Sequence, residues 1–195
     1  MAYCGGMDIE TYRALPLRHR IITAFRDVQK WGYGEGGYPF ARPGLPGGKW
    51  LVGPAPNRIN CSMLTAYLLS TAFPHAAWDD GTYAQLQIMG SDLWSPMAAV
   101  QAAGVATKII PAADDLVPGW VVLTQAWKST SPPRGGHARL CEVGIDGDTL
   151  IVWESTNRAG PDGAPLGPSV SVASWDDLRQ RYPAGIRAAV LRDSV

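Results

Sequence analysis

Three residue types in this chain could together carry out nucleophilic chemistry: a cysteine, a histidine and a carboxylate. Cys61 is the first residue of an apolar segment, Cys61 to Ala72, that follows Asn60 and ends before Pro74. Asparagine is a preferred helix N-cap, so this segment is predicted to be a helix that begins at Cys61. A helix N-terminus offers partial positive charge and free backbone N–H groups, which lower the pKa of a cysteine thiol. Cys61 is therefore a candidate thiolate nucleophile.

A thiolate nucleophile needs a histidine from elsewhere in the fold. The chain has three histidines. His19 lies among arginines in an expected helix, which is typical of a solvated helix face, and His75 lies beyond the far end of the Cys61 segment. His137 follows Gly135-Gly136 and opens an expected strand, so the glycines give access to the ring while a sheet holds it. His137 is the candidate partner of the thiol.

A third polar group is needed to orient the imidazole, and Glu154 is the candidate. The sequence Asp146-Gly147-Asp148 predicts a hairpin turn between two strands, which brings Glu154 back beside His137. Glu154 could also be a rim carboxylate paired with Arg139 or Arg158. Both interpretations remain open at the level of sequence.

The elements that must position these residues change character along the chain. Residues 8–31 carry a helical apolar stripe, with Asp8 as a candidate N-cap and Pro16 as a possible kink, and residues 32–60 form a loop rich in glycine and proline. Ser95 to Gly104 is expected to be a helix. Short strands then follow at Trp120 to Trp127, His137 to Ile145, Thr149 to Glu154, Ser169 to Ala173 and Ile186 to Leu191, with a last helix from Ser174 to Tyr182.

Helices followed by a mostly antiparallel sheet predict an α+β fold. The 195 residues, of which 46% are apolar, suit one domain, with residues 1–56 as N-terminal helix and loop and residues 57–195 as the catalytic core. The 17 basic and 17 acidic side chains give no broad positive field, so we expect neither nucleic acid nor a membrane as partner. The start of the chain has no secretory signal, so synthesis in the cytoplasm is expected.

The three cysteines, Cys4, Cys61 and Cys141, include no CxxC pair. Neither a disulfide framework nor a thiolate zinc site is therefore predicted, and no metal or cofactor is expected. Cys141 lies inside an expected strand, where a cysteine is usually a small buried core residue. Cys61 remains the cysteine with a predicted chemical role.

Four motifs resemble a known group of enzymes. They are Asn60-Cys61-Ser62, Pro118-Gly119-Trp120-Val121-Val122, Gly136-His137-Ala138-Arg139-Leu140 and the stretch from Asp148 to Asn157. In order and type these motifs look like the CHAP and NlpC-type cysteine peptidases and amidases, a papain-like superfamily that cuts amide bonds in bacterial peptidoglycan. The resemblance covers roughly Asn57 to Asn157. It implies a papain-like fold with the nucleophile at a helix N-terminus.

The resemblance also implies roles for individual residues. Cys61 would be the nucleophile, His137 the general base and then acid, and Glu154 the orienting residue, with Asn157 in reserve for that third role. The backbone N–H of Cys61 and the side chain of Asn60 would stabilise the oxyanion, with Asn57 as the other candidate. The implied partners are peptidoglycan stem peptides.

The sequence departs from that family in two ways. The stretch between Cys61 and His137 is longer than usual, and the segment from Trp78 to Trp94 has no counterpart in the family. A phage lysin, a tail-associated wall hydrolase or a delivered effector would fit the missing signal, acting at the wall or periplasm or as part of a virion. Two alternatives remain: an inactive structural or adaptor protein of a virion or injection machine, and a Cys-His-Glu protease or transglutaminase-like enzyme acting on a protein.

Overall fold

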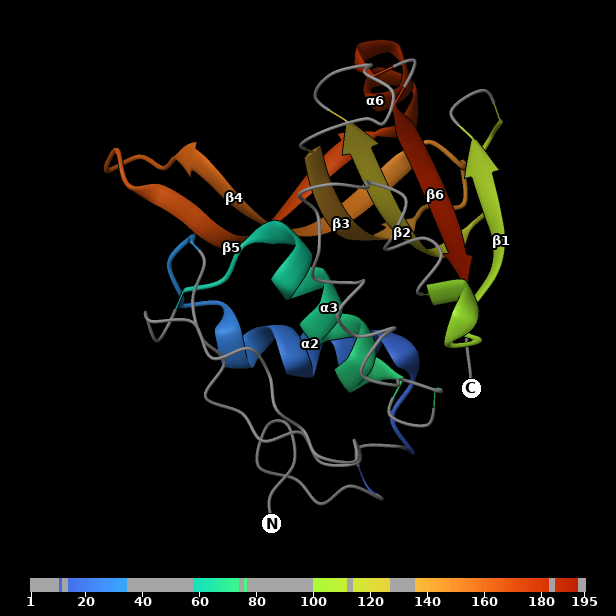
Figure 1. Ribbon diagram of the computed structural model, residues 1–195, viewed down its shortest axis with the longest axis horizontal. Helices are drawn as coiled ribbons and strands as arrows, with labels where there is room; N and C mark the ends of the chain where they lie inside the picture. The colour runs from blue at the N-terminus through green and yellow to red at the C-terminus, as the bar shows by residue number, and fades with distance from the viewer. Residues whose placement is uncertain are drawn as a thin grey trace.

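The computed structural model describes residues 11, 14–34, 58–73, 76, 100–111, 114–126, 136–182 and 185–192. Within these residues the chain has an α+β arrangement, as the sequence predicts (Figure 1). The helices are α2 (Leu17–Val28), α3 (Cys61–Ala72) and α6 (Trp175–Arg181). The strands are β1 (Ala106–Pro111), β2 (Gly119–Ala126), β3 (Gly136–Val143), β4 (Thr149–Ala159), β5 (Pro165–Ser174) and β6 (Ile186–Leu191).

The six strands form one sheet in the order β1-β6-β2-β3-β4-β5, and each neighbouring pair is antiparallel. The predicted turn between β3 and β4 is confirmed. Gly147 has φ 74°, a conformation that favours glycine, and the Asp146 carboxylate accepts hydrogen bonds from the backbone N–H groups of Asp148 (3.1 Å) and Thr149 (2.9 Å). This turn fixes which β3 residue lies opposite which β4 residue.

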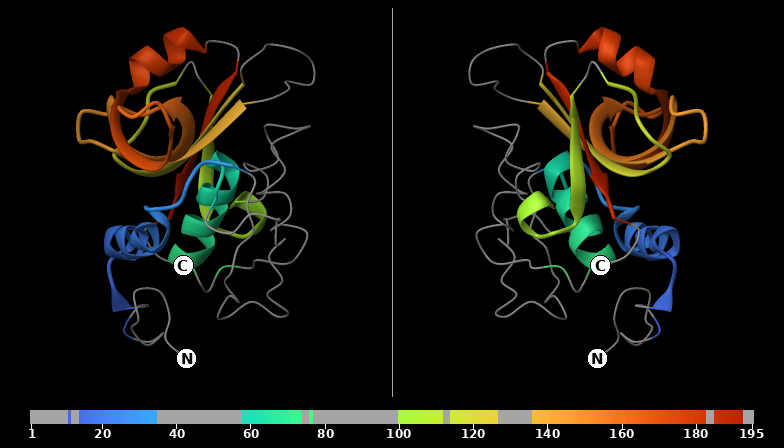
Figure 2. Two further views of the ribbon diagram at one scale, coloured as in Figure 1. Left: turned by 90° about the vertical axis from the view of Figure 1, so that its left-hand side faces the viewer. Right: turned by 90° about the vertical axis from the view of Figure 1, so that its right-hand side faces the viewer.

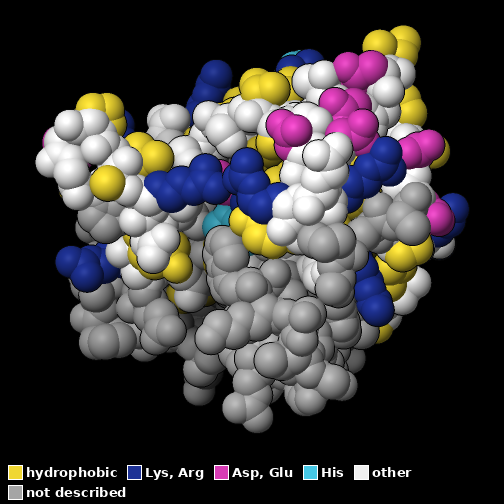
Figure 3. Space-filling model, turned by 90° about the horizontal axis from the view of Figure 1, so that it is seen from above, with side chains coloured by type: hydrophobic (Ala, Val, Ile, Leu, Met, Phe, Trp, Pro, Cys, Tyr) yellow, Lys and Arg dark blue, Asp and Glu magenta, His cyan; other side chains and the backbone are white. Residues whose placement is uncertain are grey.

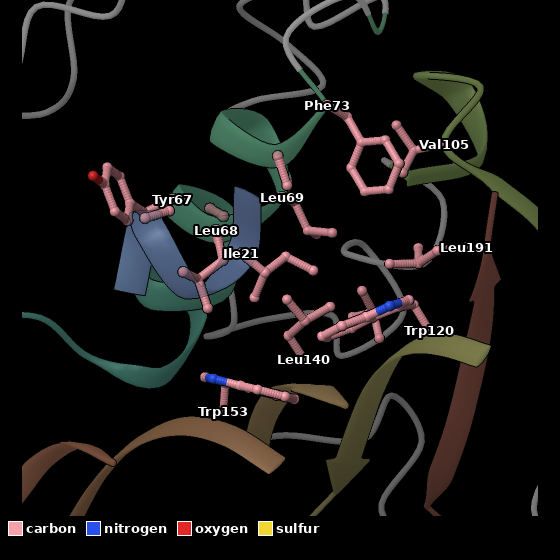
Figure 4. Packing of buried hydrophobic residues seen from close by; sticks show 14 of the residues in the cluster. Ile21, Tyr67, Leu68, Leu69, Phe73, Val105, Trp120, Leu140, Trp153 and Leu191 are labelled. Carbon is pink, nitrogen blue, oxygen red and sulfur yellow. The ribbon is translucent and has the colours of Figure 1, made fainter. Parts of the chain in front are cut away.

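Helices α2 and α3 pack on one face of the sheet. Trp120, Leu140 and Trp153 point from the strands toward Ile21 of α2 and Leu68 of α3 (Figure 4). The Trp120 and Trp153 rings stack with centroids 5.1 Å apart. Fully burying a large apolar side chain contributes roughly 2 kcal/mol, so this cluster holds α3 firmly against the sheet.

The opposite face of the sheet has its own apolar cluster. Val121, Cys141 and Val152 alternate onto this face and pack with Trp175 and Leu178 of α6. Figure 2 shows α6 at the end of the molecule away from α2 and α3. Cys141 is fully buried, which raises the pKa of its thiol, and its prediction as a core residue is confirmed.

Helix α3 is buried on nearly all sides. Nearly all of its side chains are buried, since α2 lies against it and β3 and β4 contact it from the sheet. The Tyr67 hydroxyl donates to the Asp27 carboxylate of α2 at 3.2 Å. In the part of the chain that the structure describes, no helix is long and apolar enough to cross a bilayer.

Pro16 interrupts the N-terminal helical stripe, as predicted. Helix α2 begins at Leu17, because Pro16 takes the N-cap position with an extended backbone (φ −55°, ψ 149°) and separates α2 from the helical residues 11 and 14. Asp8 lies outside the described residues. The expected helix from Ser95 to Gly104 is described only from Val100, and Gly104 ends it with φ 72°.

The sheet is larger than the sequence predicts. Strand β1 was not expected, since the segment before the Pro118-Gly119 turn lacks clear alternation, and it exists because β6 pairs with it. Strand β4 continues past Glu154 to Ala159 because β5 pairs with it to Pro165. The polar residues at the end of β4 give no strand signal of their own, so their partner strand decides their conformation.

Candidate active site

The site forms where β3 and β4 stop pairing with each other. Their paired register ends at Leu140 and Trp153. Beyond this point both strands bond to the residues at the start of α3: the Ser155 hydroxyl donates to the Ile59 carbonyl at 2.6 Å, and the Ala138 N–H bonds to the Cys61 sulfur. In Figure 1 the β4–β5 ribbon bends away from the rest of the sheet here. The start of α3 thus lies against both diverging strands.

Local sequence chemistry places Cys61 at the first position of α3. Asn60 is the N-cap, as predicted, and its side-chain oxygen accepts from the Met63 N–H at 2.9 Å and from the Ser62 hydroxyl at 3.0 Å. Helix α3 has no acidic side chain in its first turn to oppose a negative charge. The helix start therefore presents its positive end to the sulfur.

The Cys61 thiol hydrogen-bonds to the His137 ring. Burial raises the pKa of Cys61, but the hydrogen bond and the charge of His137, together with backbone N–H groups of Ala138 and Ser62, outweigh burial and lower the pKa below its ordinary value. Only 7% of the Cys61 surface is exposed. The sulfur is thus a buried thiol stabilised as a thiolate.

Glu154 orients the ring from its other side. Its Oε2 atom lies 2.5 Å from His137 Nε2 and accepts from Arg139 Nε at 2.8 Å, and all three side chains are buried. Burial raises the pKa of Glu154, but the bonds to His137 and the charge of Arg139 outweigh it and lower the pKa to about 2. An ionised Glu154 can only accept, so Nε2 carries a proton and Nδ1 is left to face the sulfur.

Both hydrogen-bond partners of His137 favour its charged form. Burial lowers its pKa, but the hydrogen bonds to Cys61 and Glu154 raise it further than burial and the nearby Arg139 charge lower it. The net pKa of His137 is above its ordinary value. The lowered pKa of Cys61 and the raised pKa of His137 both shift the thiol proton toward the ring.

Cys61, His137 and Glu154 therefore form one hydrogen-bonded chain. No family model, curated protein or solved structure matches this chain. The geometry itself indicates the chemistry: a thiolate that can attack a carbonyl carbon, and a ring that can return a proton to a leaving group. Among the described residues, no group of three or more His, Cys, Asp or Glu side chains could hold a metal ion.

The remaining candidates from the sequence have different fates. Glu154, rather than the alternative candidate Asn157, is the group bonded to His137 Nε2. Asn157 is exposed and lines the pocket beside the ring. His19 is exposed on α2, as predicted. Asn57, His75, Cys4 and the segment from Trp78 to Trp94 lie outside the described residues.

Arg139 has a larger part in the site than the sequence suggested. It was considered only as a rim partner of Glu154, whereas it is buried and shares Glu154 Oε2 with His137. Glu154 is thus buried rather than at the rim, and it bonds both His137 and Arg139. The sequence signal that could have placed Arg139 at the site is the alternation of side chains along β3, which puts residues 137 and 139 on the same face of the strand.

Gln125 is a neighbour of the site that sequence reasoning did not find. It lies directly opposite His137 in the β2–β3 register. It is 1% exposed, and neither polar atom of its side chain has a hydrogen-bond partner among the residues that the structure describes. Only strand pairing reveals this position, because β2 and the start of β3 are separated in sequence.

A pocket of about 320 Å³ opens beside His137. Its described lining also includes Tyr33, at the start of the loop rich in glycine and proline. Gly167 of β5 allows this approach: a Cβ there would lie 2.5 Å from the Trp31 carbonyl oxygen, and its φ is 64°. The close contact carries the chain around Tyr33 past the β4–β5 ribbon to the site.

We expect Asn60→Ala to lower the free energy of unfolding by about 1 kcal/mol, because the first turn of α3 loses its cap. Asn60→Ser keeps a capping oxygen and should lose only a few tenths of that amount. Chemical denaturation measures both. Equal losses of stability in the two variants would contradict the capping role of Asn60. The rate of hydrolysis by the Asn60→Ser protein separately tests whether the Asn60 amide nitrogen stabilises the oxyanion.

Proposed function

We propose that this protein is a papain-like cysteine hydrolase that cleaves amide bonds in the stem peptides of bacterial peptidoglycan. The observation that carries the proposal is the hydrogen-bonded chain of Cys61, His137 and Glu154 at the start of a buried helix. The resemblance of the motifs around these residues to those of CHAP and NlpC-type enzymes, in order and type, supports this substrate over others.

In the proposed reaction, the Cys61 thiolate attacks the carbonyl carbon of the amide and forms a C–S bond. The negative oxygen of the tetrahedral intermediate is stabilised by the backbone N–H of Cys61 at the start of α3, with the Asn60 amide nitrogen available as a second donor. His137 gives its Nδ1 proton to the nitrogen of the leaving amine, and the C–N bond breaks. A thioester and a free amine result.

Water completes the proposed cycle. His137, now neutral, accepts a proton from water as the water oxygen attacks the thioester carbon. The C–S bond breaks, and the products are a carboxylic acid and the thiolate beside a reprotonated ring. Throughout, Glu154 keeps the ring in one orientation and stabilises its positive charge, which is the role of the third residue in such triads.

The shape of the site is consistent with an extended polymer as substrate. The pocket beside His137 is lined by Gly136, by the end of β4 and by Tyr33, so it lies between parts of the chain that are far apart in sequence. The described lining is largely polar, which suits a peptide backbone. A phage lysin, a tail-associated hydrolase or a delivered effector would present this site to the wall.

Mass spectrometry of soluble products tests the proposal. The protein and its Cys61→Ala variant are incubated with purified peptidoglycans of several chemotypes, and the released fragments are identified. We expect defined muropeptides from the parent protein only, whose new termini identify the bond that is cut. If no wall yields fragments and Cys61 is also slow to react with iodoacetamide, the proposal is wrong and a structural or adaptor role is favoured. Cleavage of a protein substrate instead would favour the protease alternative.

A further inference from the structure

The described lining of the pocket beside His137 is basic. Its described lining residues are Tyr33, Gly136, His137, Arg139, Thr156, Asn157 and Arg158. Two arginines and a histidine are present, and none of the described lining residues is acidic. A ligand group placed there would be favoured if it were negatively charged.

Of the two arginines that line this pocket, Arg139 is paired with Glu154 and Arg158 has no such partner among the described residues. Arg158 is exposed near the end of β4, and no described carboxylate forms an ion pair with its side chain. By contrast, Arg18 pairs with Glu142 at 3.3 Å and Arg179 pairs with Asp115 at 3.0 Å. The guanidinium of Arg158 is thus available to a bound anion.

Arg139 can support Arg158. Among the described residues its printed bond is from Nε to Glu154, and the two terminal nitrogens are further donors of the same guanidinium. A guanidinium presents its donors in a planar fork that matches a carboxylate, and paired N–H···O bonds of this kind are about twice as strong as neutral ones. Two such groups at one pocket form a suitable carboxylate receptor.

A second pocket, of about 220 Å³, serves for comparison, because some of the same arginines line it together with carboxylates. It shares Arg139 and Arg158 with the first pocket and adds Arg181, but the carboxylates of Glu154 and Asp177 also line it. Its charges are therefore partly balanced. Figure 3 shows basic side chains gathered in a band across one face of the molecule, with a histidine beside the band.

We propose that the pocket beside His137 binds a free carboxylate of the substrate, with Arg158 as the main contact and Arg139 as the second. The substrate is then an acidic peptide in which a free carboxylate lies close to the amide that is cut. This inference rests on the proposed function, because it specifies the substrate of the same site. Arg158 acts as a specificity residue and takes no part in the transfer of protons.

Binding to full-length Cys61→Ala protein tests the inference without hydrolysis. The probes are a soluble disaccharide-peptide with free stem carboxylates and the same molecule with those carboxylates converted to carboxamides, measured by calorimetry. We expect the acid form to bind about 10- to 100-fold more tightly, as a charge-assisted hydrogen-bonded pair would give. Adding Arg158→Gln should reduce this preference to within about threefold, with little change for the carboxamide.

Arg181→Gln is the matched control, because it removes an equal charge that lines only the second pocket. It should leave the preference unchanged. Equal binding of the two probes, no binding of either, or an equal loss of preference in Arg158→Gln and Arg181→Gln would each overturn the inference. Selective binding without cleavage by the parent would reject the proposed function alone, and equal cleavage of both forms would reject the inference alone.

Discussion

Replacing Cys61 with alanine should reduce the rate of amide hydrolysis by roughly 10⁴-fold or more, which is the order seen when a nucleophile is removed from such a triad. In the proposed reaction the sulfur is the atom that forms the bond to the substrate. The fold should persist, because only one atom is lost at a position that retains slight solvent contact. Hydrolysis is followed by the release of new amino groups.

Cys141→Ala is the control for this prediction. Cys141 is also a buried free cysteine, but it lies in the apolar cluster under α6, and burial raises the pKa of its thiol. Its replacement should change the rate by no more than a few-fold. Iodoacetamide at neutral pH should likewise modify Cys61 and spare Cys141, because the thiolate is the reactive form. Preferential labelling of Cys141, or activity that survives in Cys61→Ala, would contradict the assignment.

Glu154→Gln should lower kcat by about 10²- to 10⁴-fold, comparable to the loss of the carboxylate in other triads. Glutamine keeps the shape and one acceptor oxygen but cannot stabilise the imidazolium by charge. Because Glu154 raises the pKa of His137, its removal should lower that pKa. The basic limb of the pH–rate profile, where His137 loses its proton, should therefore move to lower pH. A profile that keeps its basic limb in place would contradict the orienting and charging role of Glu154.

Stability measurements distinguish the loss of kcat expected for Glu154→Gln from a loss of folding. The pKa of Glu154 is lowered from 4.5 to about 2 in the folded protein, so its ionisation favours folding fully above pH 4.5 and progressively less as the pH falls toward 2. Glu154→Gln should remove this part of the acid dependence and leave the Arg139 charge buried without its partner. Denaturation at pH 7 and at pH 3 should show a smaller difference for the variant than for the parent.

The sequence alone determined the parts of the site that depend on local chemistry. Asn60 is a cap by virtue of its own side chain, so it placed Cys61 at a helix start without reference to the rest of the chain. The turn at residues 146–148 has a conformation that its own glycine and aspartate favour, so it predicted that Glu154 would return to His137. Short-range hydrogen bonds and backbone preferences are sufficient for both features.

Tertiary structure decided everything that depends on residues distant in sequence. The polar end of β4 is a strand only because β5 pairs with it, and it places Arg158 at the pocket. Arg139 could be a rim residue or a partner of the triad until the divergence of β3 from β4 buried it beside Glu154. The meeting of the Cys61 sulfur with His137 requires α3 to pack where those strands separate. Such contacts are stabilised by burial and strand pairing across the fold, and these energies are not encoded in any one local segment.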